Sequence, residues 1–228
     1  MARPARAGLT PMCTNYRPTA RDIVQEQLGL LPPTFSYPEE VWPQMLAPML
    51  IASRDRGAIE WREAMFGLVP FWADGIKIAR QTYNARSETV ASKPSFRGPW
   101  RRGQFCLLPM QAFYEPDYES GKAVRWRIER CDRQAFTVAG IWDTWVDRSG
   151  SVERRLHSFS MLTINADAHP LMARFHKPGD EKRSLVVIDA AQRDTWLHAD
   201  GDTAAAMLAD LPPGEFQAAP DPLVRKRA

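Results

Sequence analysis

The sequence is poor in cysteine, and it lacks any long apolar run. Only three of the 228 residues are cysteines, and no two of them form a Cys-x-x-Cys pair. This odd number argues against a disulfide framework and against a cysteine zinc site, and it is typical of a reducing cytoplasm. No apolar run approaches the roughly 20 residues that a membrane helix needs. We therefore expect a cytoplasmic protein with no metal, no cofactor and no membrane contact.

The sequence also lacks a large excess of one charge. Lys and Arg number 30 and Asp and Glu number 27, so the formal net charge is only +3. Charge alone therefore does not establish nucleic-acid binding, although it leaves room for local basic patches. Apolar residues make up 44% of the chain, which suffices for one large domain or two small ones. No segment is repeated.

Short β-type runs separated by turn residues dominate the middle of the chain. Two of them, 49–53 and 58–67, are joined by a turn-like segment and predict a hairpin. The runs that predict further strands are 104–109, 111–116, 123–130, 134–142, 153–165 and 184–188. The middle of the protein is therefore expected to be rich in strands.

Helical patterns are few and short. Thr19 followed by Asp22 is typical of a helix N-cap, and the periodic pattern after it stops at Gly29. The proline-rich segment 31–48 predicts extended chain over the core. Further helices are expected at 167–173, 190–197 and 202–211. The prediction is an α+β fold with one continuous core.

Four segments contain polar residues that periodicity does not explain: Met12-Cys13, YNARSET at 83–89, AFYEP at 112–116 and MARFHKPGDEKR at 172–183. Each has an ordinary interpretation. A lone cysteine near a terminus is usually inert, Glu115 can be a strand-end carboxylate, and His176 can be a loop histidine among charged neighbours. Asn84 and Arg86 can instead cap a helix at 86–92, in which Glu88 would be structural.

In order, spacing and local sequence, these segments and FGLVPFW at 66–72 resemble the signature blocks of the SOS response-associated peptidase (SRAP) family. The resemblance implies a SRAP domain at 12–216, an extension at 1–11 and a basic tail at 217–228. The implied fold is a strand-rich pseudo-barrel of antiparallel and mixed sheet with a few flanking helices. The implied activity is covalent capture of abasic sites in single-stranded DNA as a thiazolidine on Cys13, with autopeptidase and lyase activity.

The resemblance also implies roles for individual residues. Glu115 would move protons at the α-amine of Cys13, and His176 would protonate the sugar oxygen as the aldehyde opens. Asn84 would hold the α-amine, and Arg86 would hold a flanking phosphate. The implied aromatic and cationic contacts to single-stranded DNA are Phe71, Trp72, Trp100, Arg101 and Arg17. For Trp100, a place in the core is an equal alternative.

The position of Cys13 departs from the family pattern, in which the chain begins Met-Cys. With residues 1–11 attached, the nitrogen of Cys13 is an amide and cannot form an imine. Either translation begins at Met12, or the domain cuts its own chain before Cys13.

Two other functions are compatible with the same residues. A cysteine peptidase acting on other proteins would use Cys13 as nucleophile, His176 as base and Asn84 as orienting group. A non-covalent reader of damaged single strands would need only the aromatic and basic residues. In each case we expect a monomer, which is associated with the nucleoid when it binds DNA.

Overall fold

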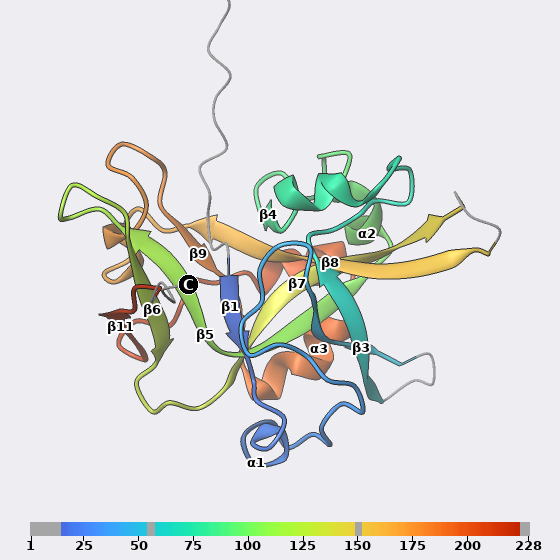
Figure 1. Ribbon diagram of the computed structural model, residues 1–228, viewed down its shortest axis with the longest axis horizontal. Helices are drawn as coiled ribbons and strands as arrows, with labels where there is room; N and C mark the ends of the chain where they lie inside the picture. The colour runs from blue at the N-terminus through green and yellow to red at the C-terminus, as the bar shows by residue number, and fades with distance from the viewer. Residues whose placement is uncertain (1–14, 54–57, 149–151, 224–228) are drawn as a thin grey trace, which may run out of the picture.

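The computed structural model describes residues 15–53, 58–148 and 152–223. Within these ranges eleven strands form one mixed sheet, with short helices around it (Figure 1). The strands are β1 (Asn15–Pro18), β2 (Leu46–Ala52), β3 (Ile59–Phe66), β4 (Asn84–Arg86), β5 (Phe105–Asp117), β6 (Val124–Arg130), β7 (Phe136–Asp147), β8 (Arg154–Asn165), β9 (Arg183–Leu185), β10 (Val187–Ile188) and β11 (Phe216–Pro220). The predicted strand-rich α+β fold is confirmed.

The helical segments each have six residues or fewer in the described ranges. They are α1 (Val24–Leu28), α2 (Arg97–Arg101), α3 (Arg193–Leu197), α4 (Gly201–Ala206) and the 3₁₀ segments η1 (Ile76–Gln81), η2 (Met172–Arg174) and η3 (Ala190–Gln192). Among them there is no helix with the length and apolar character of a membrane span.

The sheet is organised around β5. The strand order is β10-β7-β8-β3-β2-β5-β6-β11, and β5 also pairs with β7, so that β7, β8, β3, β2 and β5 form a closed circuit. All pairings are antiparallel except those of β3 and β4 with β8. On one edge β5 pairs first with β7 and then with β6, and on the other edge first with β2 and then with β1. Both edges of its second half are therefore covered.

β5 is one strand of 13 residues, whereas the sequence predicted two strands divided near Pro109. Proline has no N–H, so it normally ends a ladder. The Pro109 carbonyl accepts from the Thr19 amide at 3.2 Å, so the missing N–H faces the β1 edge. On that edge the pairing with β2 ends at Leu107 and the pairing with β1 begins at Met110. The proline therefore lies in a gap of the ladder.

Two helix predictions need correction. Thr19 does not cap α1, because it is buried beside β5, and α1 begins five residues later without a side-chain cap. The predicted end is confirmed: Gly29 has a φ of 69°, and its N–H donates to Gln25 O at 3.2 Å. The helix considered at 86–92 is a series of turns after β4.

Three boundaries also differ from the prediction. The helix expected at 167–173 is reduced to η2, and the strand expected at 184–188 is divided into β9 and β10. The expected tail at 217–228 begins inside β11, which pairs with β6 from Phe216 to Pro220. Residues 217–220 are therefore part of the sheet.

Gly140 allows β5, β7 and β8 to pack closely. A Cβ at this position would lie 2.9 Å from both Cys106 Sγ and Ser160 O, which is closer than packed atoms approach. We expect Gly140→Ala to lower the free energy of unfolding by about 1–3 kcal/mol, measured by urea denaturation. Gly75→Ala is the control, because its Cβ would meet nothing within 4 Å, and its stability should change by less than about 1 kcal/mol. Equal losses in both variants would contradict the packing argument.

Candidate active site and nucleic-acid interface

Glu115 and His176 meet at the end of β5. Glu115 lies opposite Trp126 of β6 and is buried. The chain after η2 returns to the same end, where Phe175 bridges to Asp117 and the His176 amide donates to Pro116 O at 2.9 Å. As a result, His176 Nδ1 lies 3.6 Å from Glu115 Oε2. Two of the segments that the sequence singled out are thus brought together.

His176 has a constrained backbone and a buried ring. Its φ is 67°, in the left-handed region that residues with a side chain seldom adopt. Nε2 lies 3.3 Å from Arg183 O, and because a carbonyl only accepts, we assign the ring proton to Nε2. Burial lowers the pKa of His176, although the hydrogen bond to the Arg183 carbonyl opposes this effect. The neutral ring therefore presents the lone pair of Nδ1 to Glu115.

The first described residues of the chain lie beside this pair. β1 runs along β5 with Asn15 opposite Tyr114, next to Glu115 (Figure 1). The Asn15 amide donates to Glu40, which also accepts from Arg125 at 2.7 Å. The Arg125 guanidinium in turn lies 3.4 Å from the centre of the Tyr114 ring. The start of β1 is therefore fixed by side chains as well as by its ladder, while Cys13 lies outside the described residues.

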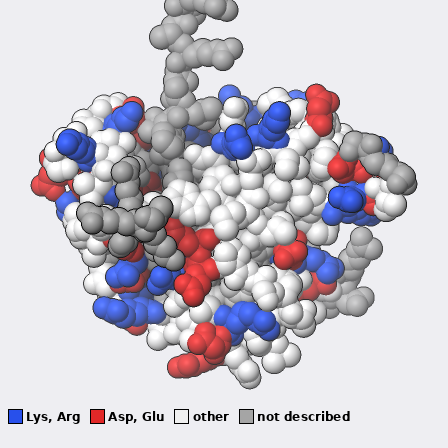
Figure 2. Space-filling view, viewed as in Figure 1, with Lys and Arg blue, Asp and Glu red and all other residues white. Residues whose placement is uncertain are grey.

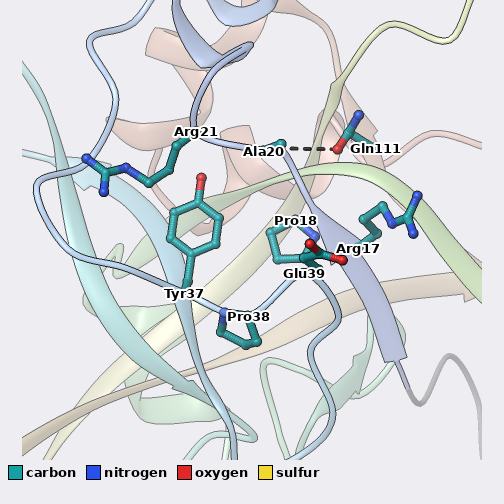
Figure 3. A pocket seen from close by; sticks show the side chains of 8 residues that line it. All are labelled: Arg17, Pro18, Ala20, Arg21, Tyr37, Pro38, Glu39 and Gln111. Atoms are coloured by element: carbon teal, nitrogen blue, oxygen red, sulfur yellow. Dashed lines mark hydrogen bonds between the residues drawn. The ribbon is translucent and has the colours of Figure 1, made fainter.

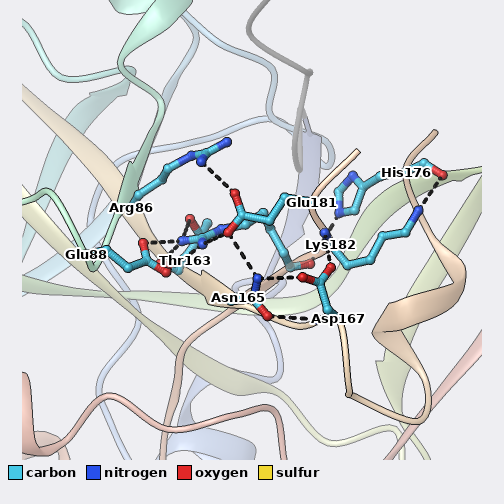
Figure 4. Close-up of polar contacts among 9 residues, drawn as sticks. Arg86, Glu88, Thr163, Asn165, Asp167, His176, Glu181 and Lys182 are labelled. Carbon is cyan, nitrogen blue, oxygen red and sulfur yellow. Dashed lines mark hydrogen bonds and ion pairs between the residues drawn. The ribbon is translucent and has the colours of Figure 1, made fainter. Parts of the chain in front are cut away.

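Asn84 and Arg86 lie on β4, which pairs in parallel with β8. They are two residues apart on a strand, so their side chains point to the same face. The Arg86 guanidinium is 44% exposed and donates to Glu181 Oε2 at 2.6 Å (Figure 4). Arg86, which was predicted to bind a phosphate, thus lies at the surface and is paired with the Glu181 carboxylate.

Arg183 is a buried cation that sequence analysis did not identify. Its side chain is 1% exposed and donates to Glu88 at 2.6 and 2.9 Å, to Glu181 at 2.7 Å and to Thr163 O at 2.7 Å (Figure 4). Glu88 therefore has a structural contact, made with Arg183 and not within the helix considered at 86–92. Nothing in the charged run 180–183 distinguishes the one buried cation, because its burial depends on the pairing of β9 with β8. The Arg183 carbonyl also contacts the His176 ring. Arg183 therefore connects His176 to the ion pair of Glu181 with Arg86.

A cavity of about 410 Å³ lies beside His176. Its lining side chains are Tyr118, Glu119, Arg174, His176, Pro178 and Lys182. Arg174 donates to Asp117 and to Glu119, and its guanidinium lies 3.9 Å from the centre of the Trp126 ring. The rim of this cavity is therefore held by charge pairs and a cation–π contact.

Two of the predicted stacking aromatics are exposed on the loop between β3 and η1. Phe71 is 66% exposed and Trp72 48% exposed. The loop is held from behind, because Trp145 Nε1 donates to Ala73 O at 2.7 Å and Gln44 Nε2 donates to Ile76 O at 3.3 Å. A cavity of about 510 Å³ follows Trp72 along residues 73–78. Both rings are therefore accessible to a ligand on a supported loop.

Trp100 is not exposed, and its predicted stacking role is not supported. It is 7% exposed and packs edge-on against Phe105 with 5.2 Å between ring centres. The alternative of a core position is the one that the structure shows. Its neighbour Arg101 is exposed at the end of α2. The aromatic and cationic run at 96–102 thus divides into a buried face and a basic face.

Arg17 lines a third cavity, of about 350 Å³, beside β1. Figure 3 shows Arg17 and Arg21 at opposite sides of it with the Tyr37 ring between them. The Tyr37 hydroxyl donates to Thr19 O at 2.6 Å, which fixes the ring, and burial raises the pKa of Tyr37 to about 12. Gln111 accepts from the Ala20 amide at 3.3 Å. Arg17 is therefore on the outward face of β1, where it is available to a flanking phosphate.

The basic side chains do not form one continuous field. Figure 2 shows Lys and Arg scattered among acidic residues over the face in view. This distribution agrees with the net charge of +3. Any contact with an anionic polymer on this face must therefore be made by individual arginines and not by a uniform potential.

The other two cysteines are separate from the site. Cys106 is buried in β5, where burial raises the pKa of its thiol, and Cys131 is exposed after β6. Within the described ranges no three His, Cys, Asp or Glu side chains are grouped as metal ligands.

Comparisons with solved structures support the fold. A crystal structure of a protein from Bordetella bronchiseptica is 31% identical, with a TM-score of 0.83, and covers 92% of this chain and 100% of that chain. A protein from Bacteroides thetaiotaomicron is 22% identical, with a TM-score of 0.74 over 90% of each chain, and is similar in fold alone.

Several relatives are named abasic site processing proteins. YoaM of Bacillus subtilis is 34% identical over 143 residues, which are 62% of this chain and 56% of YoaM. YoqW of the same organism is 29% identical over 143 residues, 62% of this chain and 57% of YoqW. HMCES of Gallus gallus is 27% identical over 151 residues, 54% of this chain and 44% of HMCES. The chain thus matches about half the length of these relatives.

A family model described as SOS response associated peptidase (SRAP) matches residues 12–221. The match contains every segment whose geometry is described above, from β1 to β11. The chain therefore belongs to the SOS response associated peptidase (SRAP) family.

Proposed function

We propose that this chain processes abasic sites in single-stranded DNA by covalent capture on Cys13. The observation that carries the proposal is the buried Glu115–His176 pair, 3.6 Å apart, beside the start of β1. Cys13 precedes Asn15 by two residues, and two residues of chain span at most about 7 Å. The placement of Cys13 beside this pair is part of the proposal, since residue 13 lies outside the described residues. The names of the relatives supply the substrate class.

The proposed chemistry uses both reactive groups of a terminal cysteine. The α-amine adds to the aldehyde carbon of the ring-opened sugar, and loss of water gives an imine. The thiolate then adds to the imine carbon while the nitrogen takes a proton, which closes a thiazolidine. Reference pKa values of about 7.7–8.0 for the amine and about 8.5 for the thiol leave both groups mostly protonated at pH 7. A base is therefore needed before either can react.

Glu115 and His176 are the groups that move these protons in the proposal. Glu115 accepts the proton of the α-ammonium, and the neighbouring Nδ1 lone pair of His176 shares it. The same proton then leaves with the carbinol hydroxyl as water. Each positioned acid or base of this kind contributes about 10² to 10⁴ in rate. Lyase activity follows from the same imine, because an imine acidifies the adjacent carbon and permits β-elimination.

The DNA contacts in this proposal are local. Arg86 binds a flanking phosphate, Asn84 on the same face of β4 holds the α-amine, and Phe71 and Trp72 stack on bases. Arg17 and Arg101 contribute further phosphate contacts. Stacking has little preference for sequence, so the aldehyde supplies the selectivity.

A free amino terminus at Cys13 is required by this chemistry. We propose that it arises either by translation from Met12 or by cleavage of the chain before Cys13, with Glu115 as proton carrier in the second case. Both routes give the same final chain, so the intact mass of natively expressed Glu115→Gln distinguishes them: this variant should retain residues 1–12 only if the domain cuts its own chain. A wild-type sample that retains residues 1–12 throughout would contradict both.

The first test is a denaturing gel of the protein with single-stranded DNA that carries one abasic site. We expect a shifted, denaturant-resistant band with damaged DNA and none with undamaged DNA. Cys13→Ser should abolish the band because it removes the thiol, and Glu115→Gln should slow its formation by about 10² to 10⁴. Cys131→Ser, which removes an exposed thiol elsewhere, should leave the band unchanged.

The other outcomes of this gel identify other functions. The absence of a band, with the terminus verified as free Cys13, would overturn the covalent proposal. Salt-sensitive binding that survives Cys13→Ser would then indicate a non-covalent reader. Cleavage of casein that depends on Cys13 would indicate a peptidase.

The exposed aromatic loop predicts a measurable contribution to binding. Phe71→Ala and Trp72→Ala should each weaken the affinity for undamaged single-stranded DNA by roughly 1–3 kcal/mol, measured by fluorescence anisotropy, because each removes a stacking surface. Leu31→Ala, which also removes an exposed apolar side chain, is the matched control and should bind as the wild type does. Unchanged binding in both loop variants would exclude stacking there.

The lowered pKa of His176 predicts a pH dependence of stability. Below its ordinary pKa of about 6.5 the unfolded chain binds a proton that the folded chain resists. The free energy of unfolding should therefore fall as the pH drops from 7.5 to 5.5, by at most about 1.4 kcal/mol per pH unit for one group. His176→Asn should make the fall shallower in urea titrations, since asparagine also tolerates a positive φ. Parallel curves for the two proteins would show that His176 does not titrate differently on folding.

A further inference from the structure

Glu181 is shared between a surface arginine and a buried one. Its Oε2 accepts from Arg86 at 2.6 Å, and its Oε1 accepts from Arg183 at 2.7 Å and from Asn165 at 3.1 Å (Figure 4). The Glu181 side chain is 34% exposed, so both it and Arg86 are in contact with solvent. The two ion pairs therefore differ in environment although they share one carboxylate.

Arg183 does not depend on Glu181 for its charge balance. Glu88 alone accepts from both terminal nitrogens of Arg183, and Thr163 O accepts a third bond. A bidentate carboxylate is the strongest partner that a guanidinium has in proteins. Loss of the Glu181 carboxylate therefore leaves Arg183 neutralised and hydrogen-bonded.

Arg86 is in the opposite situation. Within the described ranges, Glu181 is the residue whose carboxylate its guanidinium contacts. Burial raises the pKa of Glu181, but the hydrogen bonds from Asn165 and Arg183 outweigh this effect and the pKa is lowered. The carboxylate is therefore charged at neutral pH, and it occupies the guanidinium that the proposed function assigns to a DNA phosphate.

We infer that Glu181 is a built-in competitor of DNA phosphate for Arg86, so that this chain holds undamaged single strands less tightly than its arginines allow. The inference rests on the phosphate role of Arg86 in the proposed function. A carboxylate and a phosphate both accept from the same fork of N–H donors. A phosphate that reaches Arg86 must displace Glu181, because two anions at contact distance repel each other. Binding at this position is thus an exchange of one anion for another.

An exchange of anions has a distinct salt dependence. A phosphate neutralised by a free cation releases about 0.7 counterions from a single strand, and this release sets the slope of log K against log salt concentration. In the wild type, Glu181 keeps Arg86 away from the phosphate in part of the complexes, and in those complexes the counterion at this phosphate is not released. Arg86 therefore adds less to the slope until Glu181 is removed.

The test is binding of an undamaged single-stranded oligonucleotide to the full chain, measured by fluorescence anisotropy at several salt concentrations. Glu181→Gln should bind about two- to fivefold more tightly at low salt, the range that loss of a partly exposed ion pair allows. Its salt slope should be steeper than that of the wild type by up to about 0.7. Glu181→Ala should change both quantities in the same direction, since it also removes the carboxylate.

A double-variant cycle assigns the effect to Arg86. In an Arg86→Gln background the added Glu181→Gln should change neither affinity nor slope, because the competed cation is gone. Glu60→Gln is the matched control. Glu60 accepts from Arg62 at 2.7 Å and its side chain is 29% exposed, so this substitution removes one similar ion pair on β3. The control should leave the slope unchanged.

The outcomes separate this inference from the proposed function. If Glu181→Gln binds no more tightly than the wild type while Arg86→Gln binds more weakly, Arg86 contacts phosphate and the competitor role is rejected. If Glu181→Gln gains affinity equally in both backgrounds, the gain comes from general charge and the inference is also rejected. If Arg86→Gln changes nothing and no crosslink forms on damaged DNA, the proposed function itself fails.

Discussion

The coverage of both edges of β5 is the constraint on which the site depends. Glu115 pairs with β6 on one side, and on the other it follows Tyr114, the β5 residue opposite the start of β1. The backbone that carries this carboxylate is therefore fixed in the sheet by its neighbours. The chain that follows η2 is fixed to the same strand end through Pro116 and Asp117. The separation of 3.6 Å between Glu115 and His176 thus follows from strand pairing at Glu115 and from the backbone contacts that fix the segment after η2 to the same strand end.

This constraint also explains the unusual backbone of His176. A left-handed conformation at a residue with a side chain costs of order 1 kcal/mol or more, and it persists only where surrounding bonds determine it. Here the amide is bound to Pro116 O, and the ring nitrogen contacts Arg183 O. The strain turns the ring toward Glu115 and away from solvent. Burial then keeps the ring neutral, which leaves a lone pair available for a proton.

Local pattern predicted the strands and the site residues better than it predicted their partners. The hairpin of β2 and β3 and the end of α1 follow from short-range residue preferences. The signature segments identified Glu115 and His176 without any knowledge of which strands pair. The sequence therefore indicated candidate site residues before it indicated how they meet.

The errors have a common physical origin in tertiary contacts. β5 continues through Pro109 because this residue lies between the pairing with β2 and the pairing with β1, where no N–H is needed. Thr19 is a residue type typical of a helix N-cap, but its amide donates to Pro109 O of β5. Trp100 looks like a stacking residue beside Arg101, but one face of α2 packs on Phe105. Arg183 is one cation in a charged run, and only the pairing of β9 buries it. Each outcome depends on a segment distant in sequence, which no local window contains.

The weak overall charge is compatible with the proposed function, in which the selectivity comes from the covalent step. Undamaged single strands offer the same phosphates and bases as damaged ones, so tight non-covalent binding would occupy the protein at sites without an aldehyde. A net charge of +3 and an arginine that is already paired with a carboxylate both limit that binding. The proposed covalent capture needs only a brief encounter, because the bond that would form at the lesion does not depend on the affinity of the surrounding contacts. Modest affinity for the strand is then an advantage, since it lets the protein leave intact DNA and remain at the damaged sugar.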